Sequence, residues 1–352
     1  MNTIIQRISL EEVDTLDLSQ AVKLLKNGEL VAFPTETVYG LGGDALDETA
    51  AKRIYEAKGR PSDNPLIVHI ASVTALEVLA CEVPESAYQL AEEFWPGPLT
   101  MILKKSDLVP YSTTGGLDTI AIRMPSHPVA KRLIEESQVY IAAPSANVSG
   151  RPSPTTAGHV IEDMQGRIAM IIDGGSAKIG LESTIVDLVS GRPLILRPGY
   201  ITKKKLEKIL PTIDYDPAVI AKEKSEVILA KAPGMKYRHY APQGELAIFE
   251  GPMEQVITTI RTLAREKLLK GQTVGIIATD ETSSRYQEGT VKSIGSRKDE
   301  EAIAAHLFGI LREFDTLGVS YIFSESFEDN SLSQAIMNRL LKAAGYQVIR
   351  CN

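Results

Sequence analysis

A change of pattern along the chain limits its fold more than any other feature. Over residues 1–211 of the 352, short apolar runs often follow one another directly, whereas from 244 onward apolar runs and amphipathic helices alternate regularly. Between these parts, residues 212–243 hold three prolines, mixed charges and no sustained periodicity. We therefore expect two domains, 1–211 and 244–352, joined by a linker at 212–243.

The first part predicts a large twisted mixed sheet with helices, because its strands follow one another too often for a purely parallel βαβ arrangement. Strands are expected at 30–34, 66–70, 99–105, 119–125, 139–144, 168–173, 183–189 and 193–198. Helices are expected at 48–58, 85–94, 128–137, 156–165 and 203–210. The residues after the first strand, up to 45, form a threonine-rich turn and then three glycines, outside any expected strand.

The second part predicts a smaller Rossmann-like parallel α/β domain. Its expected strands are 245–250, 273–279, 291–295, 320–326 and 346–350, and its expected helices are 253–270, 299–316 and 332–344. Regular alternation is typical of crossover connections between parallel strands, so we expect helices on both faces of this sheet.

Composition and charge narrow the class of protein. A content of 43% apolar residues is enough to fill two cores, and no apolar stretch reaches the roughly 18–20 residues that span a bilayer. The first residues carry acids where a secretory signal carries a basic and then an apolar run, so we expect a cytoplasmic protein. The two cysteines, Cys81 and Cys351, exclude a disulfide framework and a structural zinc site. A net charge of −7 favours a small-molecule site over a nucleic-acid track.

The stretch AKGRPSDNPLIVHI concentrates polar side chains around a helix end. Asp47 is the expected N-cap of this helix and Gly59 its expected stop, which leaves Lys58 and Arg60 at the C-terminus. These two cations either complement the helix dipole or bind a phosphate or carboxylate ligand. The proline-rich loop that follows favours a ligand for Arg60, because a rigid loop presents a guanidinium at low entropic cost.

Other polar side chains lie within or beside apolar strands. His69 in LIVHI is either a core histidine bonded to a backbone carbonyl or part of a site. Arg123 in TIAIRMP must face an acid of the protein or an anionic ligand, because arginine is seldom buried unpaired. Ser183 in LESTIVDL and Arg197 in LILRPG likewise set a polar side chain against a strand.

Two loops supply hydroxyl groups. Thr35 and Thr37 either form a turn or line a polar pocket at a strand end, where α/β proteins place ligands. The glycines that follow fit neither the dinucleotide fingerprint nor the P-loop. The run APSANVSGRPSPTTAG is either a plain loop or one whose small residues let backbone amides approach an oxyanion, and Thr155 or Thr156 caps the next helix.

These residue types indicate a kind of chemistry. The first domain has no Ser/His/Asp order, HExxH motif or paired acids in a loop, which disfavours acyl-enzyme chemistry. Clusters of cations and hydroxyls at strand ends instead indicate group transfer by positioning and charge neutralisation, with a polyphosphate as the natural anion. The linker stretch APGMKYRHYAP is either a spacer or a loop that closes over the ligand with its aromatics and with Lys236, Arg238 and His239.

Together these segments resemble the YrdC-like family, and the two-part layout resembles its long, two-domain form. The matching stretches are PTETVYGLG, KGRPSDNPL, FWPGPLT, IAIRMPSHP, APSANVSGRPSPT, GLESTIVD, LRPG, PGMKYRHYAP and AIMNRLLKAA. The resemblance implies a nucleotidyltransferase that forms threonylcarbamoyl-adenylate, pyrophosphate and water from L-threonine, bicarbonate and ATP. It implies Mg²⁺ carried by the triphosphate, with no metal ligand from protein side chains. A separate transferase complex would then use the product to modify an adenosine next to the anticodon of certain tRNAs.

The resemblance also implies the site residues. Its KxR and SxN elements match four residues with implied catalytic roles: Lys58, Arg60, Ser145 and Asn147. The implied ATP-binding residues are Lys58, Arg60, Asn64, Thr119, Ser145, Ser153, Arg197 and, in the linker, Tyr240. The implied threonine-binding residues are Thr35, His69, Arg123, Ala143 through its backbone, and Ser183.

Two alternatives accompany this hypothesis. One is an RNA-binding module of the same fold without adenylate synthesis, which leaves direct tRNA binding undecided, although KKKLEK at 203–208 is expected to be a solvated helix face. The other is carbamoyl transfer for metallocofactor maturation, whose larger relatives carry zinc-finger and acylphosphatase segments that this two-cysteine sequence lacks. The second domain departs from the family at NSLSQAIMNRL, where Ser331 and Ser333 stand in place of glycines.

Overall fold

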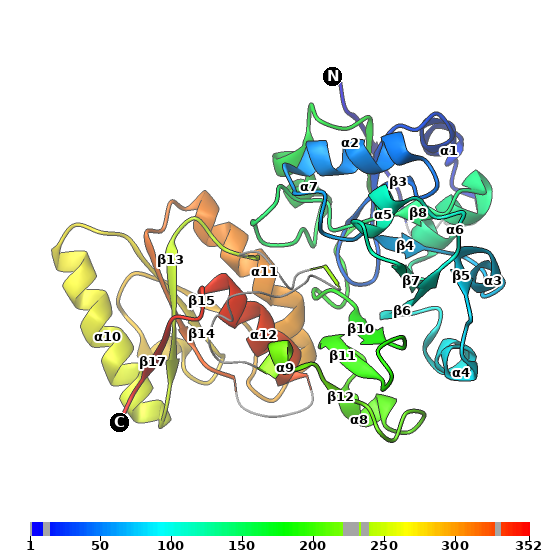
Figure 1. Ribbon diagram of the computed structural model, residues 1–352. Coiled ribbons are helices and arrows are strands. Elements are labelled where there is room, and N and C mark those ends of the chain that lie inside the picture. The colour runs from blue at the N-terminus through cyan, green and yellow to red at the C-terminus, as the bar shows by residue number, and fades with distance from the viewer. Residues whose placement is uncertain (1, 10–14, 221–231, 234–238, 328–331) are drawn as a thin grey trace. The chain divides into compact units, whose positions relative to one another are not determined.

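The computed structural model describes residues 2–9, 15–220, 232–233, 239–327 and 332–352 (Figure 1). The described residues form two compact units. One comprises 2–9, 15–149, 153–220 and 232–233, and the other comprises 150–152, 239–327 and 332–352. The division into domains at 1–211 and 244–352 with a linker between them stays a prediction.

A mixed sheet forms the centre of the first unit. Its strands are β1 (Ile4–Arg7), β2 (Val31–Phe33), β3 (Gly40–Asp44), β4 (Ile67–His69), β5 (Ala80–Cys81), β6 (Leu99–Lys105), β7 (Thr119–Arg123), β8 (Ile141–Ala142), β9 (Met170–Asp173), β10 (Thr184–Asp187), β11 (Leu194–Arg197) and β12 (Asp214–Tyr215). Their order is β1-β9-β2-β3-β8-β4-β7-β6-β10-β11-β12, and β5 pairs with β6. Because β4 and β7 are parallel while β3 is antiparallel to β2 and β8, the predicted mixed sheet is confirmed.

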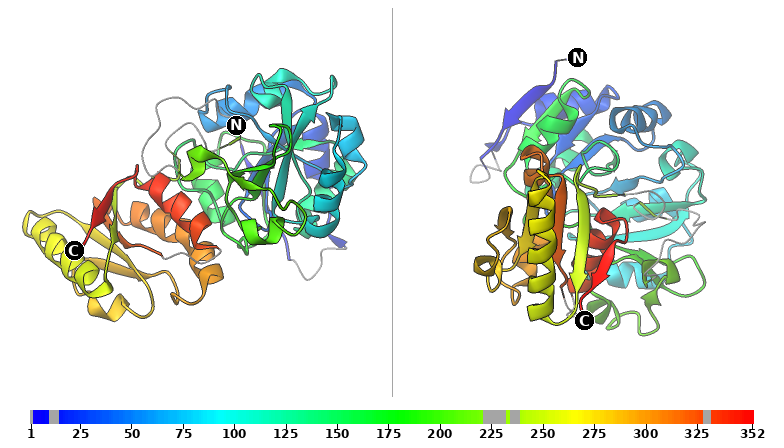
Figure 2. Two further views of the ribbon diagram at one scale, coloured as in Figure 1. Left: turned by 60° about the horizontal axis from the view of Figure 1, so that its bottom comes forward. Right: turned by 90° about the vertical axis from the view of Figure 1, so that its left-hand side faces the viewer.

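Helices cover both faces of this sheet (Figure 1, Figure 2). They are α1 (Ser19–Lys26), α2 (Glu48–Lys58), α3 (Ala75–Leu79), α4 (Glu85–Phe94), α5 (Tyr111–Thr114), α6 (Pro128–Ser137), α7 (Ala157–Met164), α8 (Lys203–Leu206) and α9 (Pro217–Ile220). On one face, Leu25 of α1 and Leu133 of α6 share an apolar cluster with Phe33 of β2. On the other face, Ile54 of α2 clusters with Ala32, the neighbour of Phe33, because successive residues of a strand project to opposite sides.

The structure adds elements that were not predicted in this unit, and it shortens α8. The added elements are the strands β1, β3, β5 and β12 and the helices α1, α3, α5 and α9. β3 is a strand in the glycine-rich stretch, where none was expected, since glycine is depleted in strands. It forms because Leu41 is fully buried and the segment pairs on both edges, with β2 and with β8. α8 ends at Leu206 instead of 210, because the chain tightens into a turn in which Ile209 N donates to Leu206 O just before Pro211. The eight predicted strands are all present, several of them shorter than expected.

The second unit contains an all-parallel sheet. Its strands are β13 (Glu245–Glu250), β14 (Val274–Ala278), β15 (Thr290–Ser293), β16 (Tyr321–Glu325) and β17 (Val348–Arg350), in the order β15-β14-β16-β13-β17. Its helices are α10 (Met253–Leu269), α11 (Glu300–Thr316) and α12 (Ser333–Ala343), with a short 3₁₀ turn, η2 (Ser283–Arg285). Ile260 of α10 packs on one face with Ile276, whereas Phe314 of α11 lies against Gly275 on the other. The predicted parallel domain with helices on both faces is therefore confirmed (Figure 1, Figure 2).

The departure from the family falls at the start of α12. Ser333 is the first residue of this helix and is buried. Ser331 lies outside the described residues. The helix begins at Ser333, one residue after the predicted start, so serine at 333 is compatible with it.

Candidate functional site

A single cross-strand row carries several of the predicted site residues. His69 of β4 pairs with Arg123 of β7, and Arg123 pairs in turn with Thr100 of β6. The row continues through Ile185 of β10 to Arg197 of β11. Side chains of directly paired residues project to the same side of a sheet, so these residues share one face. This is the face that α1 and α6 cover further along the sheet.

Glycines leave two positions of β3, further along the same sheet, without side chains on this face. A Cβ atom at Gly42 of β3 would lie 2.8 Å from Ile141 Cγ2 and 2.8 Å from Phe33 Cε1. At Gly40 it would lie 3.3 Å from the Cβ of Ala143, whose backbone is implied to bind threonine. The glycines thus serve close packing of the strand and do not form a phosphate-binding loop.

Lys58 joins the end of α2 to the loop after β8. Asp47 caps α2 through Thr49 N, and Gly59 ends it in the left-handed region with φ of 60°, both as predicted. The Lys58 side chain is not a solvent-exposed complement to the helix dipole, because the residue is only 2% exposed. Its Nζ donates to Ser145 O at 2.5 Å and to Asn147 O at 2.7 Å.

The SxN element is held in place by these contacts. Ser145 Oγ donates to Asn147 Oδ1 at 2.5 Å, and Asn147 Nδ2 donates to Val148 O at 2.8 Å. The backbone closes the arrangement, since Ser149 N donates to Lys58 O at 2.8 Å. The structure therefore brings together Lys58, Ser145 and Asn147, which are far apart in the sequence.

The loop between α2 and β4 holds a buried amide without a partner. Asn64 is 0% exposed, and among the described residues neither Nδ2 nor Oδ1 of its side chain has a hydrogen-bond partner. The backbone around Asn64 is fixed by hydrogen bonds, because Arg60 Nη2 donates to Asn64 O at 3.3 Å and to Pro65 O at 3.1 Å. A buried polar group without partners costs about 1–3 kcal/mol, so each one in a native protein calls for an explanation, and a ligand that supplies the missing bonds is one such explanation. Asn64 is the strongest pointer to a ligand in this part of the chain.

Arg123 pairs with an acid of the protein, one of the two partners the sequence allowed. Its Nη2 donates to Glu36 Oε1 at 2.6 Å, and its Nη1 donates to Thr37 Oγ1 at 2.9 Å. Thr35 forms the predicted turn, with its Oγ1 donating to Val38 O at 2.6 Å and lying 2.8 Å from Thr37 Oγ1. Sequence reasoning missed Glu36, although an acid between two threonines near a strand end was a usable signal.

His69 lies in the core, as one of its two interpretations states. Its Nδ1 is 3.1 Å from Ile67 O, and its ring meets that of Phe33 edge to face. Burial and, to a lesser degree, the charge of Arg123 together lower the pKa of His69 to about 3. The imidazole is therefore neutral at physiological pH and acts as a hydrogen-bonding group beside Arg123.

Ser183 and Arg197 contact each other at the far end of the row. Arg197 Nε donates to Ser183 O at 2.9 Å and Nη2 to Ser183 Oγ at 3.1 Å. Ser183 Oγ is also 2.7 Å from Thr100 Oγ1. The residue implied for threonine and the residue implied for ATP are thus direct neighbours here.

Three predicted site residues, Ser153, Thr119 and Tyr240, are not part of the cross-strand row. Ser153 Oγ donates to Glu182 Oε1 at 2.5 Å, and Thr156 rather than Thr155 caps α7. Thr119 begins β7, whereas Arg123 ends it, so about 13 Å separates their Cα atoms at the usual rise of a strand. Tyr240 belongs to the second unit, where its ring stacks on Phe308 of α11 with 5.1 Å between centroids.

The linker is described only in part. Lys236 and Arg238 lie outside the described residues. Ala232 is 0% exposed and joins an apolar cluster with Ile67, Ala121 and Ile185, which project from the face of the row. At least this residue of the linker therefore packs on the candidate site's face.

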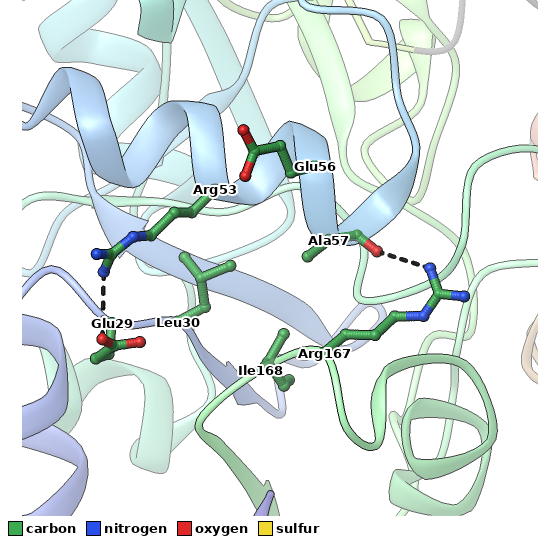
Figure 3. Close-up of a pocket in the computed structure, with 7 residues that line it drawn as sticks. All are labelled: Glu29, Leu30, Arg53, Glu56, Ala57, Arg167 and Ile168. Atoms are coloured by element: carbon green, nitrogen blue, oxygen red, sulfur yellow. Dashed lines mark hydrogen bonds and ion pairs between the residues drawn. The ribbon is translucent and has the colours of Figure 1, made fainter. Parts of the chain in front are cut away.

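A cavity of about 420 Å³ lies on another side of α2 (Figure 3). Arg53 Nη1 donates to Gly28 O at 2.7 Å and lies 3.3 Å from Glu29 Oε1, and Arg167 Nη1 donates to Ala57 O at 3.3 Å. Its lining consists of Glu29, Leu30, Arg53, Glu56, Ala57, Arg167 and Ile168. None of these is a predicted site residue, so this cavity supplies matched control positions on the same helix as Lys58.

The described residues contain neither a metal-binding cluster nor a membrane-spanning helix. Within them, no group of three or more His, Cys, Asp or Glu side chains could hold a metal ion. In the same part of the chain, no helix is long and apolar enough to cross a membrane.

The fold and the polar face together define a two-unit α/β enzyme whose candidate site is built from buried cations and hydroxyls on a mixed sheet. Residues 23–199 match the Sua5/YciO/YrdC family model, described as "Telomere recombination". Residues 201–345 match the model described as "Threonylcarbamoyl-AMP synthase, C-terminal domain". The chain belongs to the Sua5/YciO/YrdC family, which confirms the predicted resemblance.

Known proteins resemble the chain over nearly its whole length. A Pyrococcus abyssi protein named threonylcarbamoyl-AMP synthase is 52% identical over 340 residues, covering 97% of each chain. A Bacillus subtilis protein of the same name is 50% identical over 343 residues, again covering 97% of each. The crystal structure of P. abyssi Sua5 complexed with L-threonine has a TM-score of 0.91 at 49% identity, covering 99% of this chain and 100% of that one.

Proposed function

We propose that the protein is an L-threonylcarbamoyladenylate synthase, which makes threonylcarbamoyl-AMP, pyrophosphate and water from L-threonine, bicarbonate and ATP. The observation that carries this proposal is the cross-strand row, in which His69, Arg123 and Arg197 share one face of the sheet. An amino acid and a nucleotide that react must meet on one surface in a fixed geometry. The two full-length relatives named for this activity, and the threonine in the P. abyssi structure, support the proposal.

The reaction needs positioning more than covalent catalysis. The threonine amine adds to bicarbonate and water leaves, which gives a carbamate. A carbamate oxygen then attacks the α-phosphorus of ATP, and pyrophosphate departs. Charge builds up on the phosphate oxygens during this step, so the protein's task is to offset that charge with fixed donors.

The residues divide into two groups in this proposal. Arg123 pairs with the threonine carboxylate, and Lys58 and Arg60 offset charge on the phosphates. The threonine group is Thr35, His69, Arg123, Ala143 and Ser183. The nucleotide group is Lys58, Arg60, Asn64, Thr119, Ser145, Ser153, Arg197 and Tyr240. The unpartnered Asn64 amide supports the second group, because the nucleotide can supply its missing hydrogen bonds.

Mg²⁺ enters this proposal with the nucleotide. The described residues offer no cluster of three metal-ligating side chains, and hard cations of this kind prefer oxygen ligands from triphosphates and water. The ion would reduce the charge of the triphosphate when bound. Lys58 and Arg60 are the residues of this chain that would act on the same phosphates.

The linker is proposed to close over the bound substrates. The packing of Ala232 on the candidate site's face supports this role over that of a spacer. Deletion of 232–242 should then reduce turnover strongly, whereas unchanged kinetics would leave the segment a spacer. A tRNA threonylcarbamoyl transferase complex would consume the product, and cytoplasmic ATP and tRNA make the cytoplasm the expected compartment.

The basic run at 203–208 gives no specific support to RNA binding. Lys203 Nζ lies 3.0 Å from Asp214 Oδ1 and 3.9 Å from Glu207 Oε1, as expected for a solvated helix face.

Pyrophosphate release tests the proposed activity. The purified full chain with ATP and Mg²⁺ should release pyrophosphate only when both L-threonine and bicarbonate are present, and L-serine should support a much lower rate. Release that ignores threonine or bicarbonate would contradict the proposal.

A further inference from the structure

We infer that Glu36 is a positioning residue for the amino-acid substrate: it holds the Arg123 guanidinium so that its remaining donors meet the substrate carboxylate. This inference rests on the proposed function, since it concerns how the same site takes up threonine. Glu36 has no role among the residues implied by the family resemblance.

The contacts of Arg123 leave part of its guanidinium for a ligand. An arginine side chain has five N–H donors. Three are used among the described residues, because Nε donates to Gly97 O at 3.3 Å, Nη1 to Thr37 Oγ1 and Nη2 to Glu36 Oε1. The two donors that remain, one on each terminal nitrogen, suit the two oxygens of a carboxylate.

Glu36 is itself fixed from three sides. Its Oε1 accepts from Arg123 at 2.6 Å, and its Oε2 accepts from Ser126 N at 3.2 Å. Its backbone oxygen accepts from Ile179 N at 2.9 Å. Because the residue is only 8% exposed, water competes little for these bonds, and the carboxylate can hold the guanidinium in one orientation.

Charge gives Glu36 a second effect. A buried arginine without a counter-ion is costly, and its pairing with Glu36 makes the two side chains neutral together. The nearby imidazole of His69 is neutral as well. The pair of Arg123 and Glu36 therefore adds no net charge beside the substrate, which suits the carboxylate end of an amino acid in its zwitterionic form.

Kinetics of Glu36→Gln test the inference. Gln keeps the size and an acceptor oxygen but loses the charge, so the KM for L-threonine should rise on the order of tenfold or more, while the KM for ATP changes less than about twofold. Glu36→Asp, which keeps the charge, should recover part of the loss. Glu29→Gln is the matched control, because it also removes an acid from beside an arginine, Arg53, in the same unit, and its kinetics should match the wild type.

A binding measurement separates positioning from a merely structural role. Calorimetry should show that Glu36→Gln weakens L-threonine much more than L-threoninamide, which lacks the carboxylate that Arg123 meets. Equal weakening of both ligands, or an unchanged KM for threonine, would overturn the inference. If Glu36→Gln does not fold, Glu36→Asp carries the same comparison. A wild-type protein that releases no pyrophosphate would refute the proposed function, whereas the ratio of the two ligand affinities still decides the role of Glu36.

Discussion

Lys58 Nζ donates a 2.7 Å hydrogen bond to the backbone oxygen of Asn147, and so fastens the C-terminal end of α2 to the loop after β8. This contact joins the two short motifs that the proposed chemistry needs. A buried ammonium held by carbonyl oxygens keeps its charge in place before the substrates arrive, which is how preorganised electrostatic catalysis works.

Removal of either cation should therefore suppress catalysis. We expect Lys58→Ala and Arg60→Ala each to lower kcat/KM at least about 100-fold, which corresponds to about 2.7 kcal/mol of transition-state stabilisation. Steady-state pyrophosphate release measures the change. Lys58→Met, which keeps most of the alkyl stem, separates the loss of charge from the loss of packing.

Arg53→Ala is the control for these variants. It removes a cation from the same helix, but one that lines the cavity of Figure 3. Its activity should stay within about twofold of the wild type. Near wild-type rates for Lys58→Ala or Arg60→Ala would show that the proposed site is wrong.

We expect the Asn64 side chain to strengthen ATP binding at a cost to the stability of the ligand-free protein. In Asn64→Leu an apolar side chain of similar size replaces the unpartnered amide, so the free energy of unfolding of the ligand-free protein should be unchanged or up to about 1 kcal/mol higher. The KM for ATP should rise about tenfold or more, because the nucleotide loses hydrogen bonds at a buried position. Urea denaturation and ATP titration measure the two effects. A variant that loses stability but keeps its KM for ATP would assign the amide a structural role.

Gly42 tests the close packing of β3. In Gly42→Ala the new methyl group meets Ile141 and Phe33 at 2.8 Å, which should lower the free energy of unfolding by about 1–3 kcal/mol. Gly158→Ala is the control in helix α7, where the nearest atom is 3.6 Å away and alanine should be neutral or stabilising. Denaturant titration of both variants measures the difference. Equal stability of the two would mean that β3 relaxes away from Phe33.

Acid should destabilise the protein through the buried His69 and the partly buried His127. Burial lowers the pKa of His69 to about 3 and that of His127 to about 4, whereas both titrate near 6.5 when unfolded. The unfolded chain therefore binds more protons below pH 6.5, and stability, fully present above that pH, falls as the pH drops toward 4. The slope is about 1.4 kcal/mol per pH unit for each histidine.

His69→Asn isolates one of the two contributions. The variant should lose stability less steeply between pH 6.5 and 4, by about 1.4 kcal/mol per pH unit, than the wild type. Urea denaturation at several pH values in this window measures both slopes. Identical slopes would mean that His69 is already protonated in the folded protein.

The fold was largely predictable because apolar periodicity marks most of the buried elements, although it did not reveal α1, whose Leu25 is buried. The predicted helix 48–58 coincides with α2, and its cap and stop residues act as expected. The strand β3 escaped prediction because its glycines are selected by tertiary contacts with Ile141 and Phe33, which local propensity cannot reveal.

Pairing between distant residues was less predictable than the elements themselves. The sequence shows that Arg123 needs an anionic partner, but only the folded structure brings Glu36 and Thr37, in the loop between β2 and β3, to it. The lack of hydrogen-bond partners for the Asn64 side chain among the described residues likewise depends on how the surrounding residues pack. The site residues themselves came from family resemblance, and their roles in binding stay predictions.

The labelled product of the reaction shows whether the protein makes threonylcarbamoyl-AMP. The purified protein is incubated with ATP, Mg²⁺, ¹³C-labelled bicarbonate and L-threonine, and the products are analysed by mass spectrometry, with L-serine in place of threonine as the control. We expect threonylcarbamoyl-AMP that carries one labelled carbon, formed together with pyrophosphate. ATP consumption without a labelled adenylate, or the absence of any adenylate, would contradict the proposed activity.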